Sequence, residues 1–226
     1  MVESTSGIAL HYYKYSETSV LAKIFTKNLG LQSYAIRGVR TKRSKNKLNL
    51  LFPLNILEME VTNNPKKDVQ YIKEMRAGIS LYKIYNDIHK KLLCSFISEI
   101  LIRILVKNKK EEKIYNFIEK IIFDINSSDN LDKNYAILFL LKLSDFLGFL
   151  PNMSLIEDHD FKHLLAGHNM SEKNINYIYL LLQNQLIDIP PINRKEIFNF
   201  MQNYYSSHYY NIKNLKTYKI IESLKA

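Results

Sequence analysis

The spacing of apolar residues changes once along this chain, near residue 80. Before that point they form short runs rich in β-branched and aromatic residues, separated by polar or glycine-containing turns. We expect strands at residues 8–13, 19–26, 31–36, 54–61 and 68–75, with a short helical segment near 44–51. Five short strands with a small helix between the third and the fourth are typical of an OB-type barrel, and an SH3-like barrel is the alternative.

After residue 80 the apolar residues recur at the spacing of helix faces. Two long helices are expected around residues 93–105 and 114–125, joined by a polar connector at 107–113. Further helices are expected at 134–147, 172–185 and 195–208, with a short one near the C-terminus. Gly148 and Pro151 end one helix, and Pro190-Pro191 break the chain before the penultimate one. We therefore predict an α+β protein, with an OB-type barrel at residues 1–78 and an all-helical domain at 79–226.

Charge is concentrated in the predicted strand region. The chain has 226 residues and a formal net charge of +10, and its composition of 46% apolar and 24% charged residues is that of a globular protein. Residues 1–50 contain nine lysines and arginines but only two acids, Glu3 and Glu17, which leaves +7 of the net charge there. This asymmetry indicates an anionic partner for the first region.

The most basic segment is the run from Arg37 to Lys47, R-G-V-R-T-K-R-S-K-N-K, which we call the basic run. It contains three of the six arginines of a chain that otherwise prefers lysine. A guanidinium binds phosphate bidentately and stacks on bases, so arginine here favours nucleic acid over a merely solvated loop. Such contacts grip the backbone and do not read base sequence. The candidate DNA-binding residues are Arg37, Arg40, Lys42, Arg43, Lys45 and Lys47.

Aromatic residues accompany the charge in the barrel region. Strand alternation predicts that about half of them point inward, and core packing is the favoured reading for each one taken singly. The alternative is that some present their faces to unstacked bases. The residues concerned are Tyr12, Tyr13, Tyr15, Phe25 and Tyr34.

Patterns that support catalysis are weak in this chain. Cys94 is the only cysteine, which excludes an internal disulfide and a cysteine-rich zinc module, and the glycines are too scattered for a phosphate-binding loop. His159, Asp160 and His163 have the spacing of a zinc-hydrolase helix, but the acid is one methylene too short, so surface histidines are favoured. We predict no catalytic residue, metal or cofactor, and keep a metal-dependent nuclease as the enzymatic alternative. Signal-peptide and membrane-spanning patterns are absent, and the cytosol is the expected compartment.

Several segments, in this order, resemble the RecO family of bacterial recombination mediators. The N-terminal half carries G-I-A-L at 7–10, R-G-V-R at 37–40 and L-F-P-L at 51–54. In the helical part, residues 140–151 resemble the family's leucine-rich helix ending in Gly-aromatic-x-Pro, and Tyr204-Tyr205-x-x-His208 resembles its C-terminal signature. Many relatives carry four cysteines after the proline, whereas residues 153–168 contain none, so the zinc module is absent here.

The resemblance implies an N-terminal OB domain, a helical C-terminal domain and a cytoplasmic, nucleoid-associated protein. It implies binding to single- and double-stranded DNA, annealing of complementary strands, and help in loading RecA onto DNA coated by single-stranded DNA-binding protein. RecR and the acidic C-terminal tail of the coating protein are the implied partners. Lys90, Lys91 and Arg103 are candidate cations for that tail. An RNA-binding OB-fold protein remains the alternative, because equal charge would serve both polymers.

Overall fold

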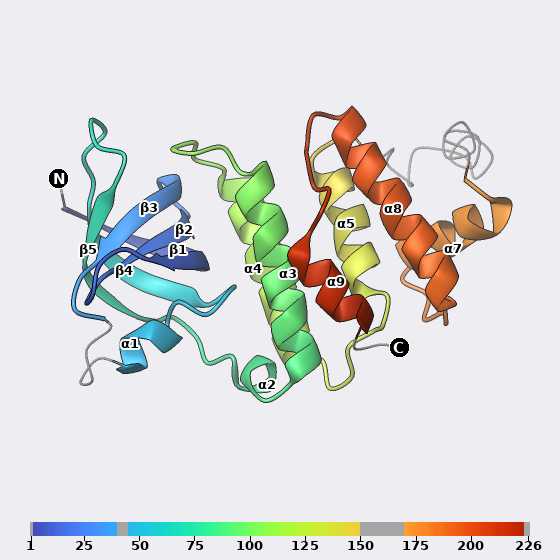
Figure 1. Cartoon of the computed structure of the whole chain (residues 1–226), viewed down its shortest axis with the longest axis horizontal. Helices are drawn as coiled ribbons and strands as arrows, with labels where there is room; N and C mark the ends of the chain where they lie inside the picture. Colours follow the sequence, from blue (N-terminus) through green and yellow to red (C-terminus); the bar gives the residue numbers. More distant parts are fainter. Residues whose placement is uncertain (1, 40–44, 150–169, 224–226) are drawn as a thin grey trace. The chain divides into compact units, whose positions relative to one another are not determined.

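The computed structural model describes residues 2–39, 45–149 and 170–223 (Figure 1). Its strands are β1 (Val2–Lys14), β2 (Val20–Thr26), β3 (Gly30–Ile36), β4 (Ile56–Thr62) and β5 (Gln70–Ala77). Its helices are α1 (Lys45–Asn49), α2 (Tyr82–Tyr85), α3 (Ile88–Ile104), α4 (Glu112–Ser127), α5 (Tyr135–Phe146), α7 (Glu172–Leu182), α8 (Pro191–Ser207) and α9 (Lys216–Ser223). None of the helices in these ranges is long and apolar enough to cross a membrane.

The five strands close into a barrel in the order β1-β2-β3-β5-β4. β1 is long enough to pair with β4 through its first half and with β2 through its second half, and Gly7 pairs on both sides, with Thr26 and with Leu57. β3 and β5 pair in parallel over two residues, whereas the other pairs of described strands are antiparallel. With α1 between β3 and β4, this arrangement is the predicted OB-type barrel, and it confirms the α+β fold class.

The barrel interior is filled by residues that alternate along each strand. β2 shows the alternation well: Val20, Ala22 and Ile24 are buried in the core, while Leu21 and Lys23 face outward and are half-buried. The core also receives residues from the segment around α1. Its members are Ala9, Val20, Ala22, Ile24, Tyr34, Ile36, Val39, Leu51, Leu57, Met59 and Val61.

The chain forms two compact units, Met1–Asp129 with Leu215–Ala226, and Asn130–Asn214. In the first unit α3 and α4 pack directly on the barrel. Ser98 of α3 donates a hydrogen bond to the carbonyl oxygen of Leu10, and the ring of Tyr115 on α4 lies 5.7 Å from that of Phe25. The boundary at residue 78 stays a prediction, since these helices belong to the same compact unit as the barrel.

The segment between α3 and α4 was expected to be a plain polar connector, but it docks on the barrel. Lys107 forms a parallel bridge with Leu31, and the N–H of Asn108 donates to the carbonyl oxygen of Leu31 at 3.1 Å. Gly30 makes this approach possible, because a Cβ at that position would overlap the backbone carbonyl of Lys109. The turn between β2 and β3 therefore makes a tertiary contact with the α3–α4 connector that could not be predicted from its sequence.

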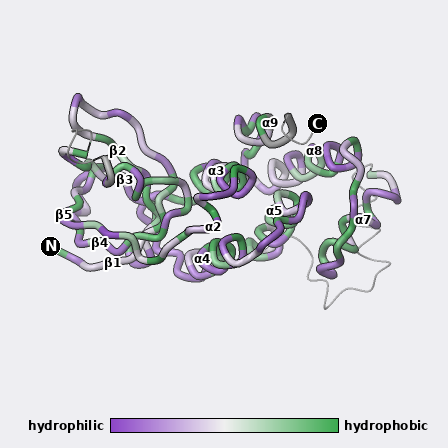
Figure 2. The backbone as a smooth tube through the Cα atoms, turned by 90° about the horizontal axis from the view of Figure 1, so that it is seen from below, coloured by the Kyte–Doolittle hydropathy of each residue, from purple (hydrophilic) through white to green (hydrophobic). Residues whose placement is uncertain are grey.

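Among the described residues, the second unit contains α5, α7 and α8, which contact one another and each bury several apolar residues. Figure 2 shows the hydrophobic positions along their backbones. The Tyr-Tyr-x-x-His segment of α8 takes part in this packing. Tyr205 is fully buried and its hydroxyl donates to the carbonyl oxygen of Leu140 at 2.7 Å, while the ring of His208 stacks on Phe149 at 4.6 Å. The family-like signature at this position thus stabilises the helical unit.

Several element boundaries differ from expectation, and two of the differences have identifiable reasons. β1 begins at Val2 rather than residue 8, because its polar first residues still pair with β4 through the backbone. α8 begins at Pro191 rather than residue 195, because proline fits the first turn of a helix, where its missing N–H costs nothing. The short α2 was not predicted at all.

Candidate nucleic-acid interface

The basic run begins where β3 ends. Gly38 adopts a φ of 70°, which turns the chain, and Val39 is fully buried in the barrel core. On the far side of the run, α1 leads to Leu51, which is also buried in the core. Core residues therefore anchor the run at both ends. Arg40, Lys42 and Arg43, and the side chain of Lys45, lie outside the described residues. The described cations of the run are Arg37 and Lys47.

Arg37 and Lys47 line one open groove of about 790 Å³ on the first unit. The groove lies beside the short β3–β5 pairing, and β5 adds a third exposed cation, Lys73. Glu74 is its only acidic residue among the described ones. We call this feature the cationic groove; its other lining residues are Ala35, Ile36, Val39, Tyr71, Ile72 and Met75.

The guanidinium of Arg37 is held by an aromatic ring. Its carbon lies 5.4 Å from the centre of the Tyr71 ring, a cation–π contact worth about 0.5–1 kcal/mol at an exposed site. Across the described part of the chain, Arg37, Lys47 and Lys73 make no ion pair with a carboxylate. Three cations without internal counter-charges in an open groove can each accept a phosphate oxygen as a partner.

Sequence reasoning missed Lys73 and Tyr71. Both belong to β5, more than thirty residues after Arg37, and they reach the groove only because β5 pairs with β3. The basic run drew attention by its density of charge, whereas Lys73 is an isolated lysine in a lysine-rich chain. Only the strand order could have revealed it.

The barrel aromatics divide between the core and the surface. Phe25 and Tyr34 are fully buried, so core packing was correct for them. For three tyrosines it was wrong: Tyr12, Tyr13 and Tyr15 are 39%, 51% and 64% exposed. Tyr12 and Tyr13 lie at the end of β1, and Tyr15 lies in the segment that follows it.

The three candidate cations on α3 do not form one surface. Lys90 is only 2% exposed, and its ammonium donates to the carbonyl oxygen of Ser128, so it stabilises the first unit and is not available to a partner. Lys91 is half-buried at the edge of a second groove. At about 100° per residue, Arg103 points some 120° away from Lys91 around the helix axis. The set cannot bind one tail together.

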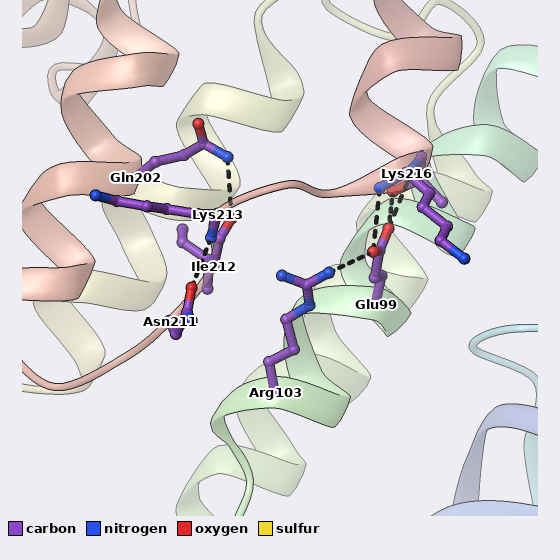
Figure 3. A network of polar contacts seen from close by, with 8 residues as sticks. Glu99, Arg103, Gln202, Asn211, Ile212, Lys213 and Lys216 are labelled. Carbon is purple, nitrogen blue, oxygen red and sulfur yellow. Dashed lines mark hydrogen bonds and ion pairs between the residues drawn. The ribbon is translucent and has the colours of Figure 1, made fainter.

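Arg103 instead belongs to a polar network that attaches α9 (Figure 3). Its guanidinium lies 2.8 Å from Glu99, whose carboxylate also accepts hydrogen bonds from the N–H groups of Lys216 and Thr217 and from the Thr217 hydroxyl, at 2.7–3.1 Å. Burial alone would raise the pKa of Glu99, but these bonds together hold that pKa below its ordinary value. A carboxylate at the first turn of α9 also complements the helix dipole.

Glu99→Gln is expected to lower the free energy of unfolding of the first unit by about 1–2 kcal/mol at pH 7. Because the folded pKa of Glu99 lies below the ordinary value of 4.5, its contribution is present above that value and is lost as pH falls through the folded pKa. The difference between wild type and variant should therefore shrink in acid. Urea unfolding at pH 7 and pH 3 tests this, with exposed Glu17→Gln as the control; a constant difference would contradict it.

The described residues offer little to nucleophilic or metal chemistry. Burial raises the pKa of Cys94 to about 12, so its thiol stays protonated at neutral pH. In the described ranges no three His, Cys, Asp or Glu side chains gather in a group that could hold a metal ion. His159, Asp160 and His163, which carried the metal hypothesis, lie outside those ranges.

Fold and groove together define a class of protein: an OB-type barrel with a cationic groove suited to phosphate, joined to helices. A family model described as "Recombination protein O N terminal" matches residues 1–78, and one described as "Recombination protein O C terminal" matches residues 85–154. These ranges cover more than half of the chain, which therefore belongs to the RecO family, as the sequence resemblance indicated.

Curated relatives match along nearly the whole chain. The chain is 28% identical over 239 residues to the DNA repair protein RecO of Flavobacterium psychrophilum, covering 97% of this chain and 98% of that protein. Identity to the DNA repair protein RecO of Flavobacterium johnsoniae is 25%, with 97% and 98% covered. Identity to the DNA repair protein RecO of Phocaeicola vulgatus is 25%, and the match covers 99% of this chain and 99% of that protein.

Proposed function

We propose that this chain is a non-enzymatic mediator of DNA repair and recombination that binds single- and double-stranded DNA and anneals complementary strands. The observation that carries the proposal is the cationic groove, which Arg37, Lys47 and Lys73 line and in which none of the three pairs with a carboxylate of the described residues. Membership of the RecO family and the similarity to proteins named DNA repair protein RecO support a DNA repair role. Such a role would place the protein with the nucleoid in the cytoplasm.

Annealing requires no chemical step, and the cations of the groove supply the phosphate contacts that it does require. Two DNA strands repel each other through their phosphates, and a cationic surface that holds both lowers this repulsion. Contacts to the backbone leave the base edges free to pair. Arg37 and Lys47, at the two ends of the basic run, both line the groove, so the described cations of the run face one surface.

The partners in this proposal are RecR and single-stranded DNA-binding protein, with RecA acting downstream. Of the candidate cations for the acidic tail of the coating protein, Lys91 has the best surroundings. It lies at the edge of a groove of about 960 Å³ that includes the apolar rings of Phe52 and Tyr85. An acidic tail with an apolar end would find both a cation and an apolar surface there.

The decisive experiment measures annealing of complementary strands that are precoated with single-stranded DNA-binding protein. We expect the protein to accelerate pairing at low salt and to lose this effect as salt screens the phosphate contacts. A rate equal to that without the protein would contradict the proposal. Cleavage of the labelled strands in the presence of Mg²⁺ or Zn²⁺ would favour a nuclease, and tighter binding to an RNA of the same sequence would favour an RNA-binding role.

A further inference from the structure

Four residues on the outer face of the barrel lie in one continuous row across four strands. Tyr13 of β1 is paired with Leu21 of β2, Leu21 with Ala35 of β3, and Ala35 with Tyr71 of β5. Directly paired residues point to the same side of a sheet, so all four share the outer face. We call this set the tyrosine row. Its strands lie side by side in the barrel (Figure 1).

The rings at the two ends of the row are accessible to solvent, whereas the two residues between them are less exposed. Tyr13 is 51% and Tyr71 39% exposed, whereas Leu21 is half-buried and Ala35 is buried, at 6%. Three strand spacings of about 4.8 Å separate the two rings by roughly 14 Å. Two aromatic side chains are therefore exposed at either end of a shallow apolar floor.

Cationic and polar groups flank this floor on both sides. The next row across the sheet contains His11, paired with Lys23, and Lys23 donates a hydrogen bond from its ammonium to the Ser33 hydroxyl at 2.8 Å. The ring of His11 meets that of Tyr13 edge-on at 4.5 Å. At the other end, Arg37 lies over Tyr71 and lines the cationic groove. The row thus continues directly into the phosphate site.

We propose that the tyrosine row stacks the unpaired bases of single-stranded DNA, with one base at Tyr13 and another at the Tyr71–Arg37 pair. The proposal rests on the DNA-binding function proposed above. Aromatic side chains beside a cationic track are the two parts from which sequence-tolerant single-strand sites are built, and OB folds use them over about 4–16 nucleotides. Arginine can join such a stack, because its guanidinium is planar and already lies on a ring.

This surface distinguishes single strands from duplex. In a duplex the base faces are already stacked on one another, so only the backbone is available to the protein. A single strand exposes its base faces, and it gains stacking on the tyrosines in addition to the phosphate contacts. Stacking leaves the pairing edges of the bases open, so a held strand can still meet its complement.

The first test compares three probes: a single strand, an abasic strand with the same number of phosphates, and a duplex. Combined Tyr13→Ala and Tyr71→Ala should weaken binding to the single strand by about thirtyfold or more, since two stacked bases are lost. Binding to the abasic strand should fall only by the loss of the Tyr71 contact to Arg37, about two- to fivefold. Tyr13→Phe with Tyr71→Phe keeps both rings and should bind like wild type. Thermal unfolding of each variant checks that the barrel is intact.

A second test uses the absence of tryptophan from this chain. Tyr13→Trp and Tyr71→Trp each introduce a single tryptophan, whose emission should be quenched by the single strand and not by the abasic strand. Quenching by neither, or equal losses of affinity for both strands in the alanine variant, would overturn the stacking proposal. The stacking proposal and the DNA-binding proposal can fail separately. If only the stacking proposal is wrong, removing the charges of Arg37 and Lys47 should still weaken binding to the abasic strand.

Discussion

Replacing Arg37, Arg40 and Arg43 together with alanine is expected to lower the affinity for duplex DNA by about two to three orders of magnitude near 0.1 M salt. Each phosphate contact contributes about 0.9 to the slope of log affinity against log salt concentration, so three lost contacts reduce that slope by about 2.7. For a single strand the reduction is about 2.1. Titrations at several salt concentrations measure the slope directly.

Two matched variants separate the position of the charges from their number. Lys173, Lys195 and Lys213 are exposed and lie in the second unit, and their replacement by alanine removes the same net charge. We expect that variant to keep the wild-type slope. Arginine-to-lysine changes in the basic run should also keep the slope while losing some affinity, because the charge remains but the bidentate geometry does not. A slope that falls equally in the lysine-to-alanine control would assign binding to net charge alone.

Gly30→Ala is expected to destabilise the first unit by about 3–5 kcal/mol. Gly30 has a φ of 71°, where a side chain is strained, and its Cβ would overlap the carbonyl of Lys109. The connector between α3 and α4 would have to move away from the barrel. It would lose the hydrogen bond from Asn108 to Leu31 as well as the packing beneath it.

Gly38→Ala provides the matched control for this prediction. Gly38 has almost the same φ, 70°, but a Cβ there meets no atom within 4 Å. Its expected cost is the backbone strain alone, about 1–2 kcal/mol. The difference between the two variants in urea unfolding therefore measures the docking of the connector on the β2–β3 turn. Equal losses would mean that this contact contributes nothing to stability.

Much of the fold could be predicted because periodicity reports local structure. The alternation along β2 and the helical spacing along α4 each place the apolar face without knowledge of the rest of the chain. Element boundaries were harder to predict from the sequence. The polar first residues of β1 pair with β4 through their backbone, which leaves no hydrophobic pattern in the sequence. The four-residue α2 is too short to show a period.

The candidate site was predictable only in the part that is contiguous in sequence. Arg37 and Lys47 stand in a run whose density of charge is visible in the sequence, and both line the groove. Lys90 illustrates the opposite case. A lysine in a helix is expected to face solvent, but the carbonyl of Ser128, distant in sequence, gives this one a buried partner.

Sequence alone was sufficient for the fold class, for the family and for the location of the basic run, because each of these depends on residue order and local spacing. Tertiary structure decided which groups meet. It placed Lys73 and Tyr71 in the groove, buried the side chain of Lys90 and placed Tyr13 and Tyr71 in one row across the sheet. Each of these depends on strand pairing or helix packing between distant segments, and a shift of one residue in strand register would turn those side chains to the other face.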